Sequence, residues 1–248
     1  MLQESLQIYF VEQDSFIYKK GYTFAKEYWQ EKKCLINSPD QNDYGIVIFW
    51  KNDLVGNINI QLKQPNTLLT SESFFGEQHW QPYFQANNFQ ITEISAYTLS
   101  KKMPMLLRQG TIIALSLSVI TLLNILGVNF ITTIQHQWFY QVLNKALKLP
   151  FFENKIIQKN QNNIAEHYYW QNKESAKIYY LNLADSETIK TYSSFFCYLN
   201  YLGVKTNFVP AFKLTNSIEH TYANFRQYVW QLDNFLNFHQ FSDKLQVV

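Results

Sequence analysis

A long stretch without charge most strongly constrains how this chain can fold. No Asp, Glu, Lys or Arg occurs between Arg108 and Lys145, and residues 111–131 form an apolar run long enough to cross a bilayer. The run contains serine, threonine and asparagine, and its pattern changes at Gly127 from helical spacing to β-branched residues. We therefore expect a buried helix followed by a buried strand, with a membrane span as the alternative.

The composition is that of an ordinary folded protein. Of 248 residues, 47% are hydrophobic and 16% charged, which permits a core without a metal or disulfide. The net charge of +2 is too small to indicate a nucleic-acid partner, and the scattered histidines predict no metal site. Two cysteines fit a reducing compartment, and residues 1–10 lack the pattern of a signal peptide. We expect a cytoplasmic protein without membrane contact.

Hydrophobic periodicity predicts alternating helices and strands, which indicates an α/β fold with helices packed on a mixed sheet. Helices are expected over residues 15–32, 111–126, 138–149, 186–201 and 217–238, with a short one over 74–84. Strands are expected over residues 44–50, 54–62, 89–99, 128–134 and 177–183. The polar stretch 158–163 predicts a boundary between a core of residues 1–157 and a C-terminal αβ extension of residues 158–248.

Several short motifs follow one another in an informative order. They are the acidic pair Asp40 and Asp43 before a strand, Val55-Gly56 in a hairpin, Glu93-Ile94-Ser95 at the start of a strand, and Pro150-Phe151 after a helix. In this order the chain resembles the GNAT acyltransferase superfamily over roughly residues 15–152. Within that superfamily it is most similar to the branch of acyl-homoserine-lactone synthases and long-chain N-acyl amino acid synthases.

The resemblance implies a GNAT-like, mostly antiparallel sheet with helices on both faces. It also implies an N-acyltransferase. Such an enzyme would move an acyl group, by this resemblance a fatty acyl group, from a thioester to a small amine or amino acid. The donor would be an acyl carrier protein or coenzyme A, with no tightly bound cofactor. In this fold the thioester lies between two splayed strands, here residues 89–99 and 128–135, and the extension would be the second half of the same domain or a tandem one.

Three residues are candidates for proton transfer in such a reaction. Glu93, on a largely apolar strand, would orient the acceptor ammonium or take its proton, although it would equally serve as an edge carboxylate paired with a lysine. His136 follows the buried strand where a pocket would open, and a structural role is the alternative. Tyr140, one turn further, would protonate the departing thiolate.

The donor phosphates are expected at the turn before the uncharged helix. Lys101, Lys102, Arg108, Gln109 and Gly110 surround this turn, where backbone N–H groups and the helix dipole also favour an anion. The alternative is a solvated basic turn.

Further residues are candidates for binding the acceptor and the acyl chain. Asp40, Asp43, Trp29 and Ser95 are expected to bind substrate, although the two aspartates also suit a turn. Phe74 belongs to an aromatic and apolar set that would line an acyl tunnel or form ordinary core: Phe74, Phe75, Trp80, Tyr83, Phe84, Leu106 and Leu107.

Departures from the synthase motifs leave a second functional class open. Asn57 and Asn59 stand where the synthases carry an arginine after Val-Gly, and Ala96 follows Ser95 in place of another arginine. A non-catalytic GNAT-like module that binds an acyl ligand or a protein partner is therefore the alternative to an enzyme.

Overall fold

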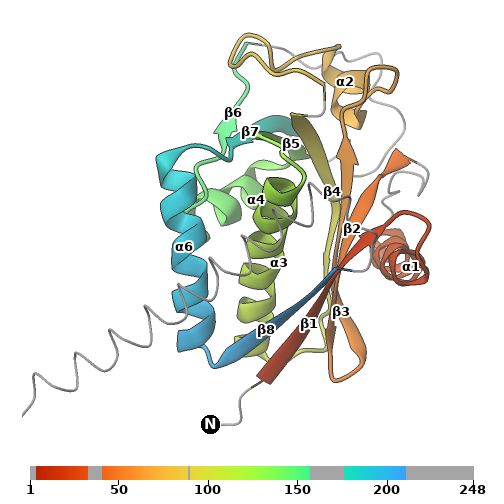
Figure 1. Cartoon of the computed structure of the whole chain (residues 1–248), viewed down its shortest axis with the longest axis vertical. Helices are drawn as coiled ribbons and strands as arrows, with labels where there is room; N and C mark the ends of the chain where they lie inside the picture. The colour runs from red at the N-terminus through yellow and green to blue at the C-terminus, as the bar shows by residue number, and fades with distance from the viewer. Residues whose placement is uncertain (1–3, 33–40, 89, 157–175, 211–248) are drawn as a thin grey trace, which may run out of the picture. The chain divides into compact units, whose positions relative to one another are not determined.

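The computed structural model describes residues 4–32, 41–88, 90–156 and 176–210 (Figure 1). The predicted boundary at 158–163 and the predicted helix over 217–238 lie outside these residues. The division of the chain at residue 157 stays a prediction. The described part that follows it, from residue 176, pairs within the same sheet as the strands before it.

One sheet of eight strands organises the described residues, in the order β6-β7-β5-β4-β3-β2-β1-β8. Neighbours are antiparallel except for β4 with β5 and β1 with β8, which are parallel. The predicted mixed, mostly antiparallel sheet is confirmed. Its strands are β1 (Glu4–Glu12), β2 (Tyr44–Trp50), β3 (Asp53–Leu62), β4 (Ile91–Leu99), β5 (Phe130–Gln135), β6 (Phe152–Glu153), β7 (Lys177–Asn182) and β8 (Val204–Pro210).

Helices cover both faces of this sheet (Figure 1). Gly21 of α1 lies against Asn57, whereas Thr111 and Leu115 of α3 lie against Gly56. Because successive residues of a strand point to opposite faces, α1 and α3 pack on opposite sides of β3. The helical elements are α1 (Phe16–Glu31), α2 (Thr70–Phe75), α3 (Met105–Ile125), α4 (Gln137–Gln141), the π-helical turn η2 (Val142–Ala146) and α6 (Ser186–Tyr201).

The uncharged stretch forms α3, Gly127 and β5, as its pattern predicts. Gly127 has a φ of 72°, a conformation that ends the helix and that glycine adopts without strain. α3 is long and apolar enough to cross a membrane, but 72% of its most apolar window is buried among the other elements. Its hydroxyl groups are satisfied inside the fold: Thr111 and Ser116 donate to backbone carbonyls one turn earlier. This packing favours a core helix over a membrane span.

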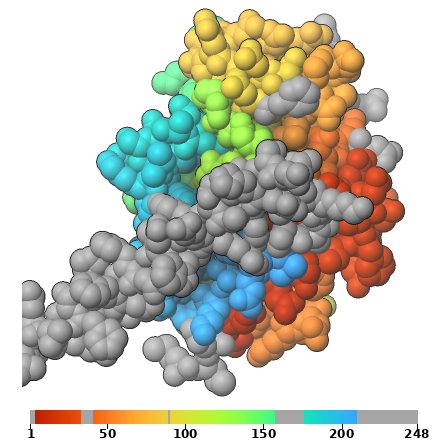
Figure 2. Space-filling model, in the orientation of Figure 1, coloured from red at the N-terminus to blue at the C-terminus, as the bar shows by residue number. Residues whose placement is uncertain are grey.

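Three strands were not expected from the sequence: β1, β8 and the two-residue β6. β1 and β8 pair in parallel at one side of the sheet, and Figure 2 shows them side by side, β1 in red and β8 in blue. In β1, Leu6, Ile8 and Phe10 are fully buried while Ser5 and Gln7 are exposed. This period-two alternation is the signal that would have identified the strand.

Three predicted helix boundaries need correction. α3 begins at Met105, six residues before the predicted start, so Arg108, Gln109 and Gly110 belong to the helix, while Lys101 and Lys102 lie in a turn before it. The helix expected over 138–149 is a short α4 continued by η2, in which the Leu147 N–H reaches back to the Val142 carbonyl. Of the helix expected over 74–84, only residues 74 and 75 are helical. They close α2, which begins earlier, at Thr70, and is followed by Gly76 with a φ of 94°.

The predicted tunnel aromatics pack mainly as core between α2, β5 and β7. Phe75 and Trp80 are buried together with Tyr180, and Phe74, Tyr83 and Phe84 pack against them. The Phe84 ring stacks on Phe130 with centroids 4.0 Å apart. The core interpretation of these side chains therefore holds in the described structure.

Candidate active site

A bulge in β4 opens the sheet between β4 and β5. Ser95 pairs with Asn59 and Thr98 with Asn57, so Ala96 and Tyr97 together oppose the single residue Ile58. Ala96 adopts a φ of 51°, which bends the strand. β4 pairs with β5 only from Ile91 to Glu93, and beyond this point the two strands separate. The result is a V-shaped cleft with Glu93 at its apex.

A cavity of about 300 Å³ occupies this cleft. It is lined by α1, β4, the start of α3, the end of β5 and the helical turns that follow β5. Its wall is mostly apolar and aromatic, with a few polar groups, as in small-molecule sites. The residues that define it are Tyr28, Trp29, Lys32, Glu93, Ser95, Ala96, Tyr97, Arg108, Ile112, Gln135, Trp138, Phe139 and Leu143.

Among the described residues that line the cavity, only Glu93 carries a carboxylate, and it is 3% exposed. Its Oε2 accepts a hydrogen bond of 2.7 Å from the Ser71 N–H on α2. The pKa of the Glu93 carboxyl is raised to about 7, because burial and, to a smaller extent, the nearby Glu72 carboxylate raise it by more than the bonds from Ser71 lower it. A carboxyl group in this range can both take and return a proton near neutral pH.

Cationic side chains gather at the cavity wall contributed by α1 and α3. Lys32 donates to the Tyr28 hydroxyl at 2.8 Å, and its ammonium lies 4.3 Å from the Tyr28 ring centroid. Lys101 lies 5.5 Å from the same ring, and Arg108 lines the cavity from the first turns of α3. The wall thus presents positive charge beside the first turn of a 21-residue helix.

A smaller cavity of about 30 Å³ adjoins the first and shares with it Ile94, Ser95, Tyr97, Gln135, Phe139 and Leu143. It reaches between α3 and β5, where Val119, Ile120 and Ile131 line it. The ring of Phe139 contacts that of Tyr97 at a centroid distance of 5.3 Å. These two rings border both cavities.

Comparison with known proteins gives one answer at the level of fold. No family model and no curated protein sequence matches the chain. Among solved structures, the CoA-dependent acyl-homoserine lactone synthase BjaI, with SAM and isopentyl-CoA, superposes with a TM-score of 0.53 at 10% identity, covering 88% of this chain and 99% of BjaI.

Two further structures agree with this match. The CoA-dependent acyl-homoserine lactone synthase MesI has a TM-score of 0.51 at 12% identity, covering 83% of this chain and 100% of MesI. The AHL synthase LasI has a TM-score of 0.51 at 11% identity, covering 75% and 93%. The chain has the fold of the acyl-homoserine-lactone synthases. The GNAT-like fold expected from the motifs is thereby confirmed.

Within this synthase fold, the residues predicted for proton transfer do not all meet. Glu93 lines the cavity, but His136 and Tyr140 are not among its lining residues. His136 is 6% exposed and precedes the first turn of α4. The Tyr140 ring stacks on Tyr179 with centroids 4.4 Å apart and planes at 11°, and its hydroxyl accepts from Asn144. The structure thus places His136 and Tyr140 outside the lining of this cavity, and their part in proton transfer stays a prediction.

Of the residues predicted to bind the acyl donor, too, only some line the cavity. Arg108 lines the cavity, while Lys101 and Lys102 are exposed in the turn before α3. Gln109 is exposed on the helix, and Gly110 is buried within it, where a β-carbon would come within 2.9 Å of a Val204 methyl group. Gly110 therefore permits close packing of α3 on β8 and does not form the expected turn.

Of the predicted substrate-binding residues, Trp29 and Ser95 line the cavity. Phe74 packs against the aromatic core instead. Asp43 accepts from the Leu62 N–H at 2.7 Å and from the Gln64 side chain at 2.8 Å, which joins β2 to the end of β3. Burial raises the pKa of the Asp43 carboxyl, although these bonds oppose the effect. Asp40 lies outside the described residues.

Several lining residues were not predicted. Tyr28 comes from the last turn of α1 and Lys32 directly follows that helix, whereas Tyr97 comes from the bulge of β4, and Trp138 and Phe139 come from α4. The helical spacing of Tyr28 and Lys32 beside the predicted Trp29 was a usable signal, because residues i and i+4 share one helix face. Among the described residues, no group of three acidic, histidine or cysteine side chains is arranged to hold a metal ion.

Proposed function

We propose that this protein is an N-acyltransferase. It moves an acyl group from the thioester of coenzyme A or an acyl carrier protein to a small amine or amino acid. One observation carries the proposal: a buried carboxyl group, Glu93, lies at the apex of the cleft between β4 and β5, with a pKa of about 7. The synthase fold, and the CoA-dependence stated for BjaI and MesI, support the thioester as donor.

Glu93 supplies the proton chemistry of this reaction. Ionised Glu93 removes a proton from the acceptor ammonium, and the free amine attacks the thioester carbonyl carbon. A C–N bond forms, the C–S bond breaks, and Glu93 passes the proton it holds to the departing thiolate. The nitrogen, which still carries one proton too many for an amide, releases it to water, so the products are an amide, a free thiol and one proton. Because Glu93 is buried, it exchanges this proton with an ammonium group that has entered the cleft and not with amines in bulk solvent.

The bulge of β4 supplies the groups that would hold the donor. Ala96 and Tyr97 line the cavity and oppose one residue of β3, so their amide groups fall outside the regular ladder. Backbone N–H groups of this kind stabilise the oxyanion that forms at a thioester carbonyl. Lys32, Lys101 and Arg108 provide positive charge for the phosphate groups of the pantetheine donor.

The test is acyl transfer by the purified full chain. Acyl-CoA and acyl-carrier-protein thioesters of several lengths are offered with a panel of amines and amino acids, while thiol release and the mass of the amide product are measured. Glu93→Gln is expected to lower the rate at least a hundredfold. The control Glu187→Gln changes an exposed glutamate of α6, paired with Lys190 at 2.6 Å, and should keep the wild-type rate.

One observation favours a second candidate, a non-catalytic module that binds an acyl ligand. Asn57 and Asn59, at the positions where the synthases carry an arginine, are each 1% exposed and share a hydrogen bond of 3.0 Å. They belong to the interior and are not among the cavity-lining residues. Binding of acyl-CoA to the full chain, with no thiol released for any amine offered, would select this candidate.

A further inference from the structure

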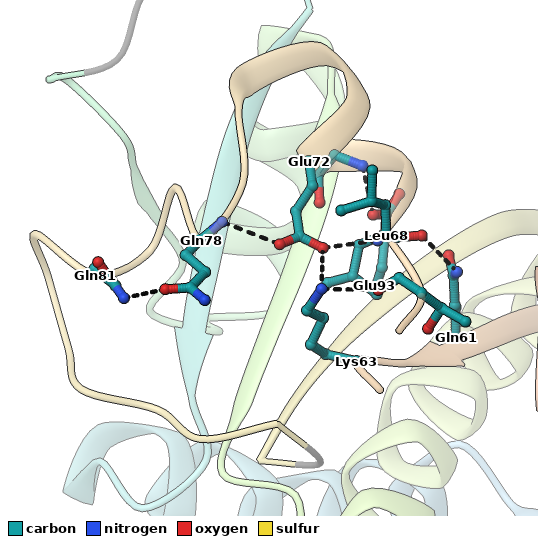
Figure 3. Close-up of polar contacts among 10 residues, drawn as sticks. Gln61, Lys63, Leu68, Glu72, Gln78, Gln81 and Glu93 are labelled. Carbon is teal, nitrogen blue, oxygen red and sulfur yellow. Dashed lines mark hydrogen bonds and ion pairs between the residues drawn. The ribbon is translucent and has the colours of Figure 1, made fainter. Parts of the chain in front are cut away.

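A second buried charge lies next to Glu93. Glu72 of α2 has no exposed side-chain surface, and Lys63, just after β3, exposes 7% of its side chain. The Lys63 Nζ lies 2.9 Å from Glu72 Oε2 and donates to the Thr67 carbonyl at 2.7 Å. Figure 3 shows these two side chains pointing toward each other beside Glu93. Burying an ion pair costs desolvation free energy, so both charged groups need further hydrogen-bond partners to be stable there.

Glu72 holds the segment that contacts Glu93. Its Oε2 accepts from the Leu69 N–H at 2.8 Å, before α2, and its Oε1 accepts from the Gln78 N–H at 3.0 Å, after it. Ser71 lies between these anchor points and donates its N–H to Glu93 at 2.7 Å. The position of the Ser71 N–H therefore depends on the two hydrogen bonds that Glu72 accepts. Through Ser71, the position of the Glu93 carboxyl depends on them as well.

The same cluster sets the charge around Glu93. Glu72 adds negative charge on the side of α2, and Lys63 offsets it from the end of β3. Lys63 also faces His79, and burial together with this ammonium lowers the pKa of His79 to about 3, so that His79 is neutral. On the cavity side, the ionisable lining residues are Tyr28 of α1, Lys32 directly after it, Tyr97 of β4 and Arg108 of α3.

We propose that Glu72 and Lys63 are positioning residues for Glu93: the pair fixes the Ser71 N–H against the Glu93 carboxyl and balances the charge that this carboxyl meets. The inference rests on the proposed function for its meaning in catalysis. It does not rest on that function for its test, because the state of Glu93 can be observed without turnover.

The test measures the titration of Glu93 in the full chain. With carbon-13-labelled glutamate, the Glu93 carboxyl resonance is assigned by its loss in Glu93→Gln and followed with pH. Glu72→Gln removes a negative charge but keeps an amide oxygen that can accept from the Leu69 N–H and so hold Ser71 in place; it should lower the pKa of Glu93. Lys63→Met removes the positive charge and should raise that pKa. The double variant should return close to the wild-type value.

Two further variants guard against misfolding and nonspecific effects. Glu72→Asp keeps the charge but shortens its reach, and should shift both the Ser71 amide resonance and the pKa of Glu93. Glu187→Gln, at the exposed pair with Lys190, should change neither. Single variants that move the pKa of Glu93 in the same direction would overturn the inference. A folded Glu72→Asp variant in which the Ser71 amide resonance and the pKa of Glu93 both keep their wild-type values would also overturn it.

The outcome separates this inference from the proposed function. If Glu72→Gln and Lys63→Met shift the Glu93 pKa in opposite directions but the protein transfers no acyl group, the positioning pair is established and the proposed enzyme activity is contradicted. Acyl transfer with a Glu93 titration that is insensitive to Glu72 and Lys63 would do the reverse.

Discussion

Gly110 of α3 lies so close to Val204 of β8 that a β-carbon on the glycine would come within 2.9 Å of a valine methyl group. Alanine normally stabilises a helix interior by up to about 1 kcal/mol relative to glycine. Here the forced contact should outweigh this gain, because overpacking costs about 1–3 kcal/mol. We expect Gly110→Ala to lower the free energy of unfolding in the wild-type background.

The same substitution should have the opposite sign once the valine is shortened. In a Val204→Ala background, Gly110→Ala is expected to raise the free energy of unfolding, measured by urea denaturation. A loss of equal size in both backgrounds would contradict the close packing of α3 on β8.

The raised pKa of Glu93 predicts how stability depends on pH. The carboxyl titrates at about 7 in the folded protein, against 4.5 as its ordinary value. Between these values the unfolded chain is ionised while folded Glu93 keeps its proton, so this group makes the protein less stable as pH rises from about 4.5 to 7. Each unit of pKa is worth about 1.4 kcal/mol, which gives a loss on the order of 3 kcal/mol.

Glu93→Gln should remove this dependence. We expect the variant to gain stability relative to wild type as pH increases through this window, with a constant difference above about pH 8. Denaturation midpoints of both proteins at several pH values measure the effect. Parallel curves would show that Glu93 titrates normally in the folded protein.

Arg108 is expected to contribute to binding of the donor and not to the chemical step. Its guanidinium lines the cavity beside the first turns of α3. Loss of a charge-assisted contact with a phosphate costs about 1.5–3 kcal/mol, so Arg108→Ala should raise the KM for acyl-CoA about tenfold or more, with kcat nearly unchanged. Lys205→Ala, an exposed residue of β8, is the control. A fall in kcat with unchanged KM would contradict this role.

Phe139 is expected to limit the length of the acyl chain. It borders both the larger and the smaller cavity, so Phe139→Ala should join them and shift the preference toward longer acyl thioesters. Phe74→Ala is the matched control, because Phe74 packs in the aromatic core away from both cavities. That variant should lower stability and leave the chain-length profile unchanged. A shift caused by Phe74→Ala alone would restore the tunnel first expected there.

Elements with a strong local pattern could be predicted from the sequence. The hairpin of β2 and β3 turns at Lys51 and Asn52, which have φ values of 49° and 69°, and Gly203 ends α6 with a φ of 69°. These features depend on a few neighbouring residues. η2 could not be predicted, because a π-helical turn differs from an α-helix by its bonding and not by an obvious sequence period.

The candidate site was only partly predictable for a related reason. Glu93, Ser95, Trp29 and Arg108 were identified, because a motif or a position in the expected fold singled them out. The partners of Glu93 were not, since Ser71 and Glu72 reach it only after α2 folds over β4. Burial, which determines the behaviour of this carboxyl, is a property of the assembled structure.

The pairing of β1 with β8 has a consequence for the time course of folding. Ser5 and Asn207 share a hydrogen bond across 202 positions of sequence. At a synthesis rate of about 5–20 residues per second, β8 emerges roughly 10–40 s after β1. Until then β1 presents an unpaired edge, a surface to which other strands readily add. The ribosome-bound chain therefore passes through an aggregation-prone interval that ends only when its late residues arrive.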